Sequence, residues 1–464
     1  MSATIILSAD RGGTVTFSLA SHQSHAVSLM NEHPHYGIFA ETGTGKTMIA
    51  LTWIYDSLIS GRIDDALVIC PASLIDSWKA AIDKMAMFGY SDFEIGLVRD
   101  AITLISYNSV WVRNKQFARK KGTHKHEIRP SVNHHWGAII CDESHRLGDP
   151  SSVQTKVILR MSELADYRFV MSGTPHSMRY VKMYGQLKFL EPTVFADYKD
   201  FERRYVLSLD YFGNPVRYDS DALESLIRSF GISIRLRDCF DMPESTESDI
   251  PIQFTPESER IYESMILKSN PDVDFTTAGG SAMKSYQVCS GFYYASEGKR
   301  IVSFATRKMD ALMDIIDGTD GKVVVFALFL HSIDRICENL AKKGIKLLRF
   351  DSSVKEPVWV DFQSDPEIKV FVTQYQKGSE GIDLFSANLM VFFEPTPSAY
   401  SLEQAKARIM RKGQVNHCTY HYLYVADTIE ERRMRSVRSG VDESRKLADE
   451  WAEEERQKYL SKAV

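Results

Sequence analysis

Short, mainly apolar runs recur along the chain and alternate with segments of helical spacing. In the first half these runs lie at 36–39, 66–70, 102–105, 136–141 and 167–171. A parallel strand that is buried on both faces is expected to look like this. The alternation of strand and helix predicts an α/β fold with an open parallel sheet wound on both faces, in which ligands bind at the carboxyl ends of the strands.

This rhythm lapses between Phe195 and about Arg300 and resumes with the run Lys322–Phe326. Further runs follow at 347–350, 369–372 and 387–393. At 464 residues the chain is too long for one hydrophobic core. We therefore expect two doubly wound sheet domains with a joining region between them in the sequence.

Composition adds little to this picture. The chain is 44% apolar and 25% charged, as in an ordinary globular protein. Its longest apolar run, Val323–Leu330, is too short to span a bilayer. Six scattered cysteines without a C-x-x-C pair suggest neither a zinc site nor a disulfide framework. With no signal-peptide pattern, we expect a cytoplasmic protein (host cytoplasm for a phage protein) and no membrane partner.

The net charge of −5 does not favour nucleic-acid binding, although a bulk figure can hide local patches. Basic residues gather at 113–129, 406–412 and 432–438. The simpler interpretation of each is a solvated surface.

A phosphate-binding loop is predicted between the run 36–39 and the helical segment 48–55. Glycines allow close backbone approach to phosphate, and the helix start offers N–H groups and a positive dipole. Lys46 would neutralise the β- and γ-phosphates of ATP, and Thr47 would ligate Mg²⁺. Ala40 stands where the strict pattern has glycine, so a Gly/Thr-rich turn is the alternative. The expected nucleotide contacts are Thr42, Gly43, Thr44, Gly45, Lys46 and Thr47.

Two carboxylates directly follow the run 136–141, where they are costly unless they have a function. Paired with the phosphate loop, Asp142 would hold Mg²⁺, directly or through water. Glu143 would orient and deprotonate the attacking water. His145 could sense the γ-phosphate. A helix N-cap is the alternative for the two carboxylates.

Two weaker candidates flank these motifs. Gln23 lies upstream of the loop, where its amide could read an adenine edge, although a surface glutamine is commoner. Ser172 and Thr174 end the run 167–171, and their hydroxyls could link the nucleotide to a second ligand.

These motifs, in this order, resemble those of superfamily 2 helicases and translocases, and several are similar to the Swi/Snf-type branch. The resemblance implies two RecA-like lobes with ATP and Mg²⁺ in the cleft between them. It also places Gln23 near the adenine. The matching segments are 42–47, 70–78, 142–147, 172–175, 189–192, 376–384 and 404–414.

In the second lobe the resemblance assigns Gly381 and Asp383 to the nucleotide and Gln404 to coupling. On a helix, Arg408 and Arg411 would share a face. Arg411 is expected as the finger that stabilises γ-phosphate charge, with Arg408 bonding phosphate or Glu143. An ordinary basic helix surface is the alternative. The chain departs from the family at Asp383 (usually Asn), Ala407 (usually acidic) and Asp351-Ser352 (usually Asp-Gly).

The resemblance also implies DNA contacts at Ser73 and Tyr107 in the first lobe and at Thr373 and Gln374 in the second. Most should reach the backbone of duplex or forked DNA, which makes binding salt-dependent.

The expected architecture is two RecA-like doubly wound lobes with a small helical insertion and a C-terminal helical brace. The predicted boundaries are 1–192 for lobe 1, 193–300 for a joining region with small helical protrusions, 301–427 for lobe 2 and 428–464 for the brace. A solvated tail is the alternative for the last segment.

The sequence therefore predicts an ATP-dependent DNA motor that unwinds or branch-migrates forks in replication, recombination or repair. A pure duplex translocase, the motor subunit of a restriction or defence complex and a DNA-gated switch stay open, and RNA is disfavoured only by family likeness. The chain's compactness resembles that of a phage or bacterial helicase. We expect a monomer, with replication or recombination proteins as candidate partners.

Overall fold

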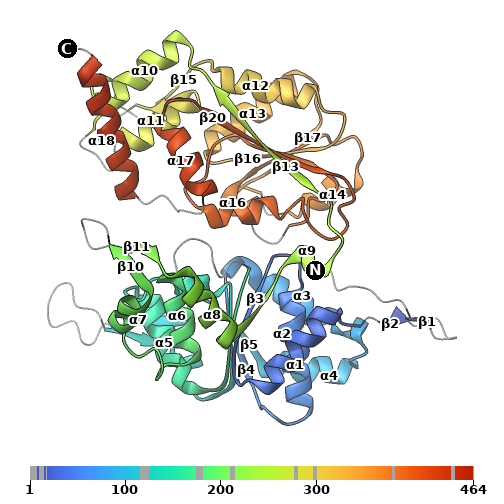
Figure 1. Cartoon of the computed structure of the whole chain (residues 1–464). Helices are drawn as coiled ribbons and strands as arrows, with labels where there is room; N and C mark the ends of the chain where they lie inside the picture. Colours follow the sequence, from blue (N-terminus) through green and yellow to red (C-terminus); the bar gives the residue numbers. More distant parts are fainter. Residues whose placement is uncertain are drawn as a thin grey trace. The chain divides into compact units, whose positions relative to one another are not determined.

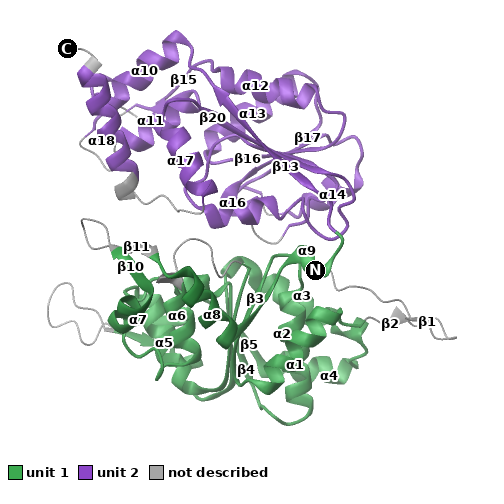
Figure 2. Ribbon diagram, in the orientation of Figure 1, with its two compact units in different colours: residues 1–241 green, residues 242–464 purple. Residues whose placement is uncertain are grey.

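The structure is a computed structural model of the whole chain (Figure 1). It describes residues 8–9, 15–16, 18–114, 125–173, 181–209, 215–275, 281–295, 300–354, 356–378, 382–439 and 445–462. The chain divides into two compact units, Met1–Asp241 and Met242–Val464 (Figure 2). Each unit contains a six-stranded sheet.

The sheet of unit 1 has the strand order β12-β3-β9-β8-β4-β5, and every neighbouring pair is parallel. All the apolar runs predicted in the first half are strands here. Because the strands run in one direction, the segments that follow them emerge at the same edge of the sheet. The strands are β3 (His35–Ala40), β4 (Ala66–Cys70), β5 (Ile102–Ser106), β8 (Trp136–Asp142), β9 (Ala165–Ser172) and β12 (Gly231–Ile234).

Helices cover both faces of this sheet, as predicted for a doubly wound fold (Figure 1). Alternate strand residues enter opposite apolar layers, so Ile140 packs in one layer and Ile139 in the other. The first layer contains α1 (Ser21–Glu32), α2 (Lys46–Ile59), α3 (Ile75–Asp83) and α4 (Asp92–Ala101). The second contains α5 (Val153–Met161), α6 (Val181–Leu190), α7 (Tyr198–Tyr205) and α8 (Ser220–Phe230).

The sheet of unit 2 has the order β13-β20-β19-β16-β18-β17 and is also parallel throughout. One face packs against α12 (Arg307–Asp317) and α13 (Leu330–Lys342). The other face is rich in aromatic contacts, such as Phe326 with Tyr375. The strands are β13 (Ser245–Ile252), β16 (Val323–Ala327), β17 (Leu347–Phe350), β18 (Val370–Gln374), β19 (Leu389–Phe392) and β20 (Cys418–Val425). Unit 2 also contains α14 (Trp359–Ser364), α15 (Tyr375–Gly378) and α16 (Ala399–Lys406).

The predicted joining region, 193–300, is divided between the two units. Residues up to Asp241 belong to unit 1, where α7 and α8 enter the core and β12 forms one edge of the sheet. β13 forms an edge of the sheet in unit 2. Its sequence is largely polar and exposed, so no apolar run marks it as a strand.

The C-terminal segment is helical, and it packs within unit 2. α18 (Arg445–Lys462) lies against α10 (Pro256–Ile266), α11 (Ser281–Cys289) and α17 (Ile429–Arg438). The Tyr262 hydroxyl donates to Oε1 of Glu455 at 3.0 Å and accepts the N–H of Ile429 at 3.0 Å. The alternative of a solvated tail is therefore wrong for this helix.

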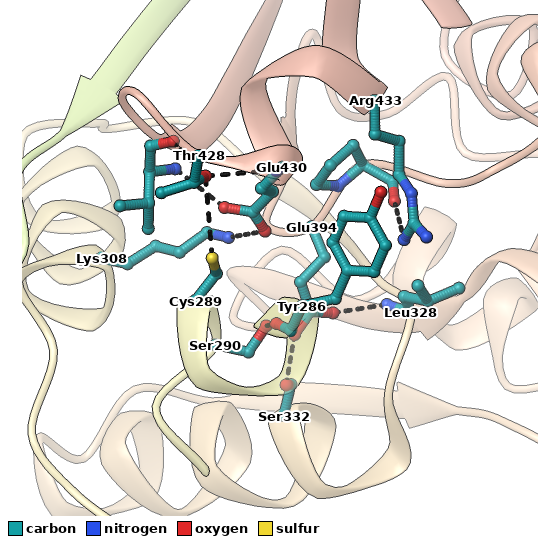
Figure 3. A network of polar contacts seen from close by, with 12 residues as sticks. Tyr286, Cys289, Ser290, Lys308, Leu328, Ser332, Glu394, Thr428, Glu430 and Arg433 are labelled. Carbon is teal, nitrogen blue, oxygen red and sulfur yellow. Dashed lines mark hydrogen bonds and ion pairs between the residues drawn. The ribbon is translucent and has the colours of Figure 1, made fainter. Parts of the chain in front are cut away.

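Unit 2 also contains a buried polar network (Figure 3). The ammonium of Lys308 on α12 lies 2.5 Å from Oε1 of Glu430 on α17, and both side chains are inaccessible. The N–H of Val425 donates to Oε2 of the same carboxylate at 2.8 Å. This ion pair fixes two helices to the sheet. Among the described helices, none combines the length and apolar character needed to cross a bilayer.

Candidate functional site

The predicted phosphate loop connects β3 to α2, which begins at Lys46, so the expected strand–loop–helix context is confirmed. Gly43 and Gly45 have φ values of +93° and +88°, in the left-handed region that favours glycine. A Cβ on Gly45 would lie 2.2 Å from Nε2 of Gln23. Both the backbone and the packing therefore require glycine at position 45.

Gln23 is fully buried on α1, so its interpretation as a surface residue is wrong. Its Oε1 accepts the N–H of Ala20 at 3.0 Å, and its Nε2 donates to the carbonyl of Thr44 at 3.0 Å. The ring Nε2 of His22 lies 3.0 Å from the same carbonyl. In this structure Gln23 supports the phosphate loop, and its reading of adenine stays a prediction.

Lys46 lies over its own loop. Its Nζ donates to the carbonyl of Ala40 at 2.8 Å, and its charge is close enough to Asp142 to oppose the rise in the pKa of that carboxyl. Thr47 follows on the first turn of α2. The glycines, the ammonium and the hydroxyl thus share one short segment at the carboxyl edge of the sheet.

Asp142 ends β8 and is 3% exposed. Its Oδ2 accepts the indole N–H of Trp78 at 2.9 Å, and its Oδ1 accepts the N–H of Glu143 at 2.9 Å. The hydroxyl of Tyr107 donates to the backbone carbonyl of Asp142 at 2.8 Å. Burial raises the pKa of Asp142 to about 6, and the charge of Glu143 adds to the rise.

Glu143 has φ +50°, a left-handed conformation that is uncommon for a residue with a side chain. Such backbone strain costs on the order of 1–3 kcal/mol and gathers at functional sites. Its Oε2 lies 3.3 Å from Nδ1 of His145. Glu143 occupies the N-cap position of the short helix that follows, Ser144–Leu147, but its side chain makes no capping hydrogen bond.

Ser172 is buried at the end of β9, the strand between β3 and β8 in the sheet. The neighbouring Ser144 hydroxyl donates to the carbonyl of Met171 at 3.0 Å, which fixes the ends of β8 and β9 to each other. Thr174 lies outside the described residues. The coupling roles of Ser172, Thr174 and His145 stay predictions.

In unit 2, the expectation that Arg408 and Arg411 lie on a helix is wrong. α16 ends at Lys406, and both arginines lie in the turns that follow, up to Gly413 with φ +100°. They are 3% and 6% exposed, so they are not an ordinary basic surface either.

The two guanidinium groups nevertheless converge. Arg408 donates to Oε1 of Gln404 at 2.8 Å and to the carbonyl of Ile382 at 3.2 Å. Arg411 donates to the same Ile382 carbonyl at 3.1 Å and forms an ion pair with Asp383. Burial lowers the pKa of Arg411 to about 10. The carboxylate that departs from the family's usual asparagine is thus the partner of Arg411. Gly381 lies outside the described residues.

The structure corrects two of the predicted DNA contacts. Tyr107 is 2% exposed, and Thr373 is fully buried with its hydroxyl donating to the carbonyl of Phe350 at 2.7 Å. Neither side chain offers a surface to DNA. Ser73 is exposed on the short helix Ala72–Leu74, and Gln374 is partly exposed with its amide donating to the Leu328 carbonyl at 3.1 Å.

The described basic segments are largely neutralised within unit 2. Arg432 pairs with Glu454 at 2.7 Å, and Lys406 pairs with Glu247 at 2.6 Å. Arg438 also pairs with Glu247. These ion pairs leave less free positive charge on the segments 406–412 and 432–438 than their sequences suggest. Residues 115–124 of the third segment lie outside the described part of the chain.

Sequence reasoning assigned no role to Trp78 or His22, and it gave Tyr107 as a DNA contact although its hydroxyl donates to the buried carbonyl of Asp142. Trp78 falls in the matched segment 70–78, but no spacing indicates that its N–H reaches Asp142. Such contacts depend on tertiary packing between α3 and the end of β8, which leaves no periodic signal.

Comparison with known proteins agrees with the motifs. Residues 22–303 match the SNF2-related domain, and residues 307–413 match the helicase conserved C-terminal domain. Since the first match covers more than half of the chain, the chain belongs to the SNF2-related family, within the Swi/Snf-type branch of superfamily 2.

Individual relatives are distant. The chain is similar to the DNA repair protein rhp54 of Schizosaccharomyces pombe, with 24% identity over 453 residues that cover 84% of this chain and 53% of the relative. It is also similar to the DNA annealing helicase and endonuclease ZRANB3 of Homo sapiens, with 22% identity over 416 residues that cover 84% of this chain and 36% of the relative. The chain thus spans about half or less of the length of these two relatives.

Among solved structures, the chain is similar to the Sulfolobus solfataricus SWI2/SNF2 ATPase core in complex with dsDNA. The identity is 21%, the coverage is 97% of this chain and 98% of the other, and the TM-score is 0.41.

Proposed function

We propose that this chain is an ATP-dependent DNA motor, which binds ATP with Mg²⁺ and uses hydrolysis to translocate along DNA. One observation carries the proposal. In a chain of the SNF2-related family, the Lys46 loop and Asp142 follow strands that end at the carboxyl edge of the unit 1 sheet, where the charge of Lys46 acts on Asp142 and the N–H of Glu143 donates to the Asp142 carboxylate.

The donor set fits a magnesium ion. Hard cations of this kind bind carboxylate and hydroxyl oxygens. Asp142 offers a buried carboxylate whose hydrogen bonds come from an indole and a backbone N–H, both neutral groups. Asp142 and Thr47 would hold the ion, which would neutralise phosphate charge when bound.

The other residues act on the nucleotide and the water. Lys46 would exchange the carbonyl of Ala40 for the β- and γ-phosphates. Glu143, alongside His145, would orient the attacking water and accept its proton. Arg411 would stabilise the charge on the γ-phosphate. Arg408, which donates to the same Ile382 carbonyl, would lie beside it.

DNA would be held mainly through its phosphates, with Ser73 as an exposed contact, so affinity should fall steeply with salt. The narrower proposal is unwinding or branch migration of forked DNA in repair, recombination or replication. The relatives described as a repair protein and as an annealing helicase support it. Translocation on duplex without strand separation, alone or as the motor of a restriction complex, is the alternative.

Lys46→Ala tests the proposal. The variant should lose DNA-stimulated ATP hydrolysis while its affinity for DNA survives, because the ammonium serves the phosphates. Lys199→Ala, at an exposed position on α7, is the matched control and should keep wild-type turnover. Hydrolysis retained by Lys46→Ala would remove the proposal.

A further inference from the structure

Two aromatic side chains, one on α3 and one directly after β5, donate hydrogen bonds to Asp142 and hold it in place. The indole N–H of Trp78 donates to the carboxylate at 2.9 Å, and the hydroxyl of Tyr107 donates to the backbone carbonyl at 2.8 Å. Trp78 is 1% exposed and Tyr107 is 2% exposed. Packed aromatic rings have few rotatable bonds, so both contacts are stiff.

Each aromatic residue lies close in sequence to an exposed polar residue at the same sheet edge. Trp78 sits on α3, five residues beyond the exposed Ser73, in the segment that follows β4. Tyr107 directly follows β5 and precedes the exposed Asn108. β8, β4 and β5 are neighbours in the sheet. The two exposed residues therefore follow the two strands that lie on one side of β8, the strand that carries Asp142.

The Asp142 carboxylate in turn restrains the backbone of Glu143. Oδ1 of Asp142 accepts the N–H of Glu143, whose backbone is in the left-handed conformation. The orientation of Asp142 thus helps to hold the strained residue that would position the attacking water. A small displacement at the end of α3 would reach both carboxylates through this chain of hydrogen bonds.

We propose that Trp78 and Tyr107 are positioning residues that couple DNA contact at the exposed segments around Ser73 and Asn108 to the Mg²⁺-binding and hydrolytic carboxylates. This inference rests on the proposed function. Residues behind a metal ligand typically tune affinity or activity by about 10–100-fold. Coupling between two binding sites is reciprocal, so DNA should tighten nucleotide binding by the factor with which nucleotide tightens DNA.

The test uses the full chain and a fluorescent, non-hydrolysable ATP analogue with Mg²⁺. Its dissociation constant is measured with and without a saturating short blunt DNA duplex, and the ratio is the coupling factor. The Mg²⁺ concentration that half-saturates analogue binding is measured in parallel. Both readouts are independent of turnover.

Trp78→Phe keeps a ring and removes the N–H. It should bring the coupling factor close to one and raise the half-saturating Mg²⁺ concentration by about 10–100-fold. Tyr107→Phe should lower the coupling factor by a smaller amount, about 2–10-fold, because it removes a bond between neutral groups. Affinity for DNA without nucleotide should stay at the wild-type value in both.

The chain offers two matched controls in unit 1. Trp53 is fully buried on α2, and its indole N–H donates to no group among the described residues, so Trp53→Phe changes packing alone. The hydroxyl of Tyr55 donates to the carbonyl of Ile82 at 3.2 Å, so Tyr55→Phe removes a similar bond elsewhere. Both controls should keep the wild-type coupling factor.

The inference is overturned if Trp78→Phe and Tyr107→Phe both keep the wild-type coupling factor while DNA stimulates hydrolysis by the wild-type chain. The proposed function then stands. An equal loss of coupling in the two controls would also overturn the inference, because general loosening of the core would explain it. If DNA neither tightens nucleotide binding nor stimulates hydrolysis in the wild type, the inference and the proposed function both fail.

Discussion

The two units bury carboxylates in opposite ways. Glu430 in unit 2 is paired with the ammonium of Lys308 at 2.5 Å inside a closed polar network (Figure 3). Asp142 in unit 1 accepts its hydrogen bonds from neutral groups, the indole of Trp78 and a backbone N–H. Burial raises the pKa of both carboxyls, but Glu430 has its own cation in direct contact.

This difference distinguishes a carboxylate whose charge is paired within the fold from one that is proposed to bind a cation. A buried charge is costly unless it is paired, so the pair in unit 2 is complete without a ligand. The carboxylate in unit 1 is held in position, but its charge is only partly offset by the more distant Lys46. It is suited to receive a cation that arrives with the nucleotide.

The largest effect on ATP turnover is expected from substitution of Arg411. Its guanidinium is buried, whereas the side chain of its partner Asp383 is 40% exposed. Loss of an arginine finger typically costs about 10³–10⁵ in rate. Arg411→Ala should therefore cut ATP turnover on that scale and leave ATP affinity near normal, as measured by steady-state kinetics and equilibrium binding. Asp383→Asn, which keeps the guanidinium, is the control and should retain turnover. A defect in ATP binding with normal turnover would reassign Arg411.

Asp142→Asn should come next. Loss of the metal carboxylate removes several kcal/mol of transition-state stabilisation, so turnover should fall about 10³-fold. Binding of ATP without Mg²⁺ should be unchanged, because the variant keeps the phosphate loop. Titration of Mg²⁺ against turnover checks this. Wild-type Mg²⁺ dependence in the variant would mean that Asp142 is structural, like Glu430.

Lys308→Met should destabilise unit 2 and leave unit 1 intact. The substitution leaves the buried Glu430 carboxylate without its cationic partner. Such an unpaired buried charge typically lowers the free energy of unfolding by about 3–5 kcal/mol. Urea unfolding with a probe in each unit measures the loss. The double variant Lys308→Met with Glu430→Gln should recover much of it, because no uncompensated charge remains. Equal free energies of unfolding for the single variant and the wild type would show that Glu430 does not depend on Lys308, which would contradict the contrast drawn with Asp142.

The smallest effect is expected at Glu455, a carboxyl of unit 2 that has no cation in hydrogen-bond contact among the described residues. Burial raises the pKa of Glu455 to about 7 from an ordinary 4.5, against which Arg432 and Lys458 act. The folded state then holds the proton more tightly than the unfolded state. Stability should therefore decline as the pH rises from about 4.5 to 7 and level off above it.

Glu455→Gln removes this titration. The variant should be more stable than the wild type at pH 8, by about 1–3 kcal/mol, and should gain nothing below pH 4.5. Denaturant unfolding of unit 2 at several pH values measures the difference. A gain that is the same at every pH would show that ionisation of Glu455 is not its source.

Much of the fold could be predicted because buried parallel strands carry an unbroken apolar signal. β4, whose five residues are all buried, matches the predicted run 66–70 residue by residue. β17 also matches the predicted run 347–350, although Arg349 interrupts it and the strand is only partly buried. The convergence of the phosphate loop with Asp142 also followed from the sequence, since parallel strands end at one edge. The edge strand β13 was missed because its exposed side chains are polar.

The site was harder to predict where tertiary contacts decide. Tyr107 and Thr373 are polar residues at strand ends, as a DNA contact should be, yet each hydroxyl donates to a buried carbonyl. Arg408 and Arg411 have helical spacing, but turns up to Gly413 take them off the helix. Neither the burial of these hydroxyls nor the end of the helix before Arg408 leaves a repeating pattern in the sequence.

A DNA motor should hydrolyse ATP faster when DNA is bound. The most direct measurement is steady-state ATPase activity with single-stranded, double-stranded and forked DNA of equal length, with release of a labelled strand followed on the fork. Duplex and forked DNA should stimulate turnover, and release of the labelled strand would support the narrower proposal of unwinding. Turnover that no DNA stimulates would contradict the proposal of a DNA motor.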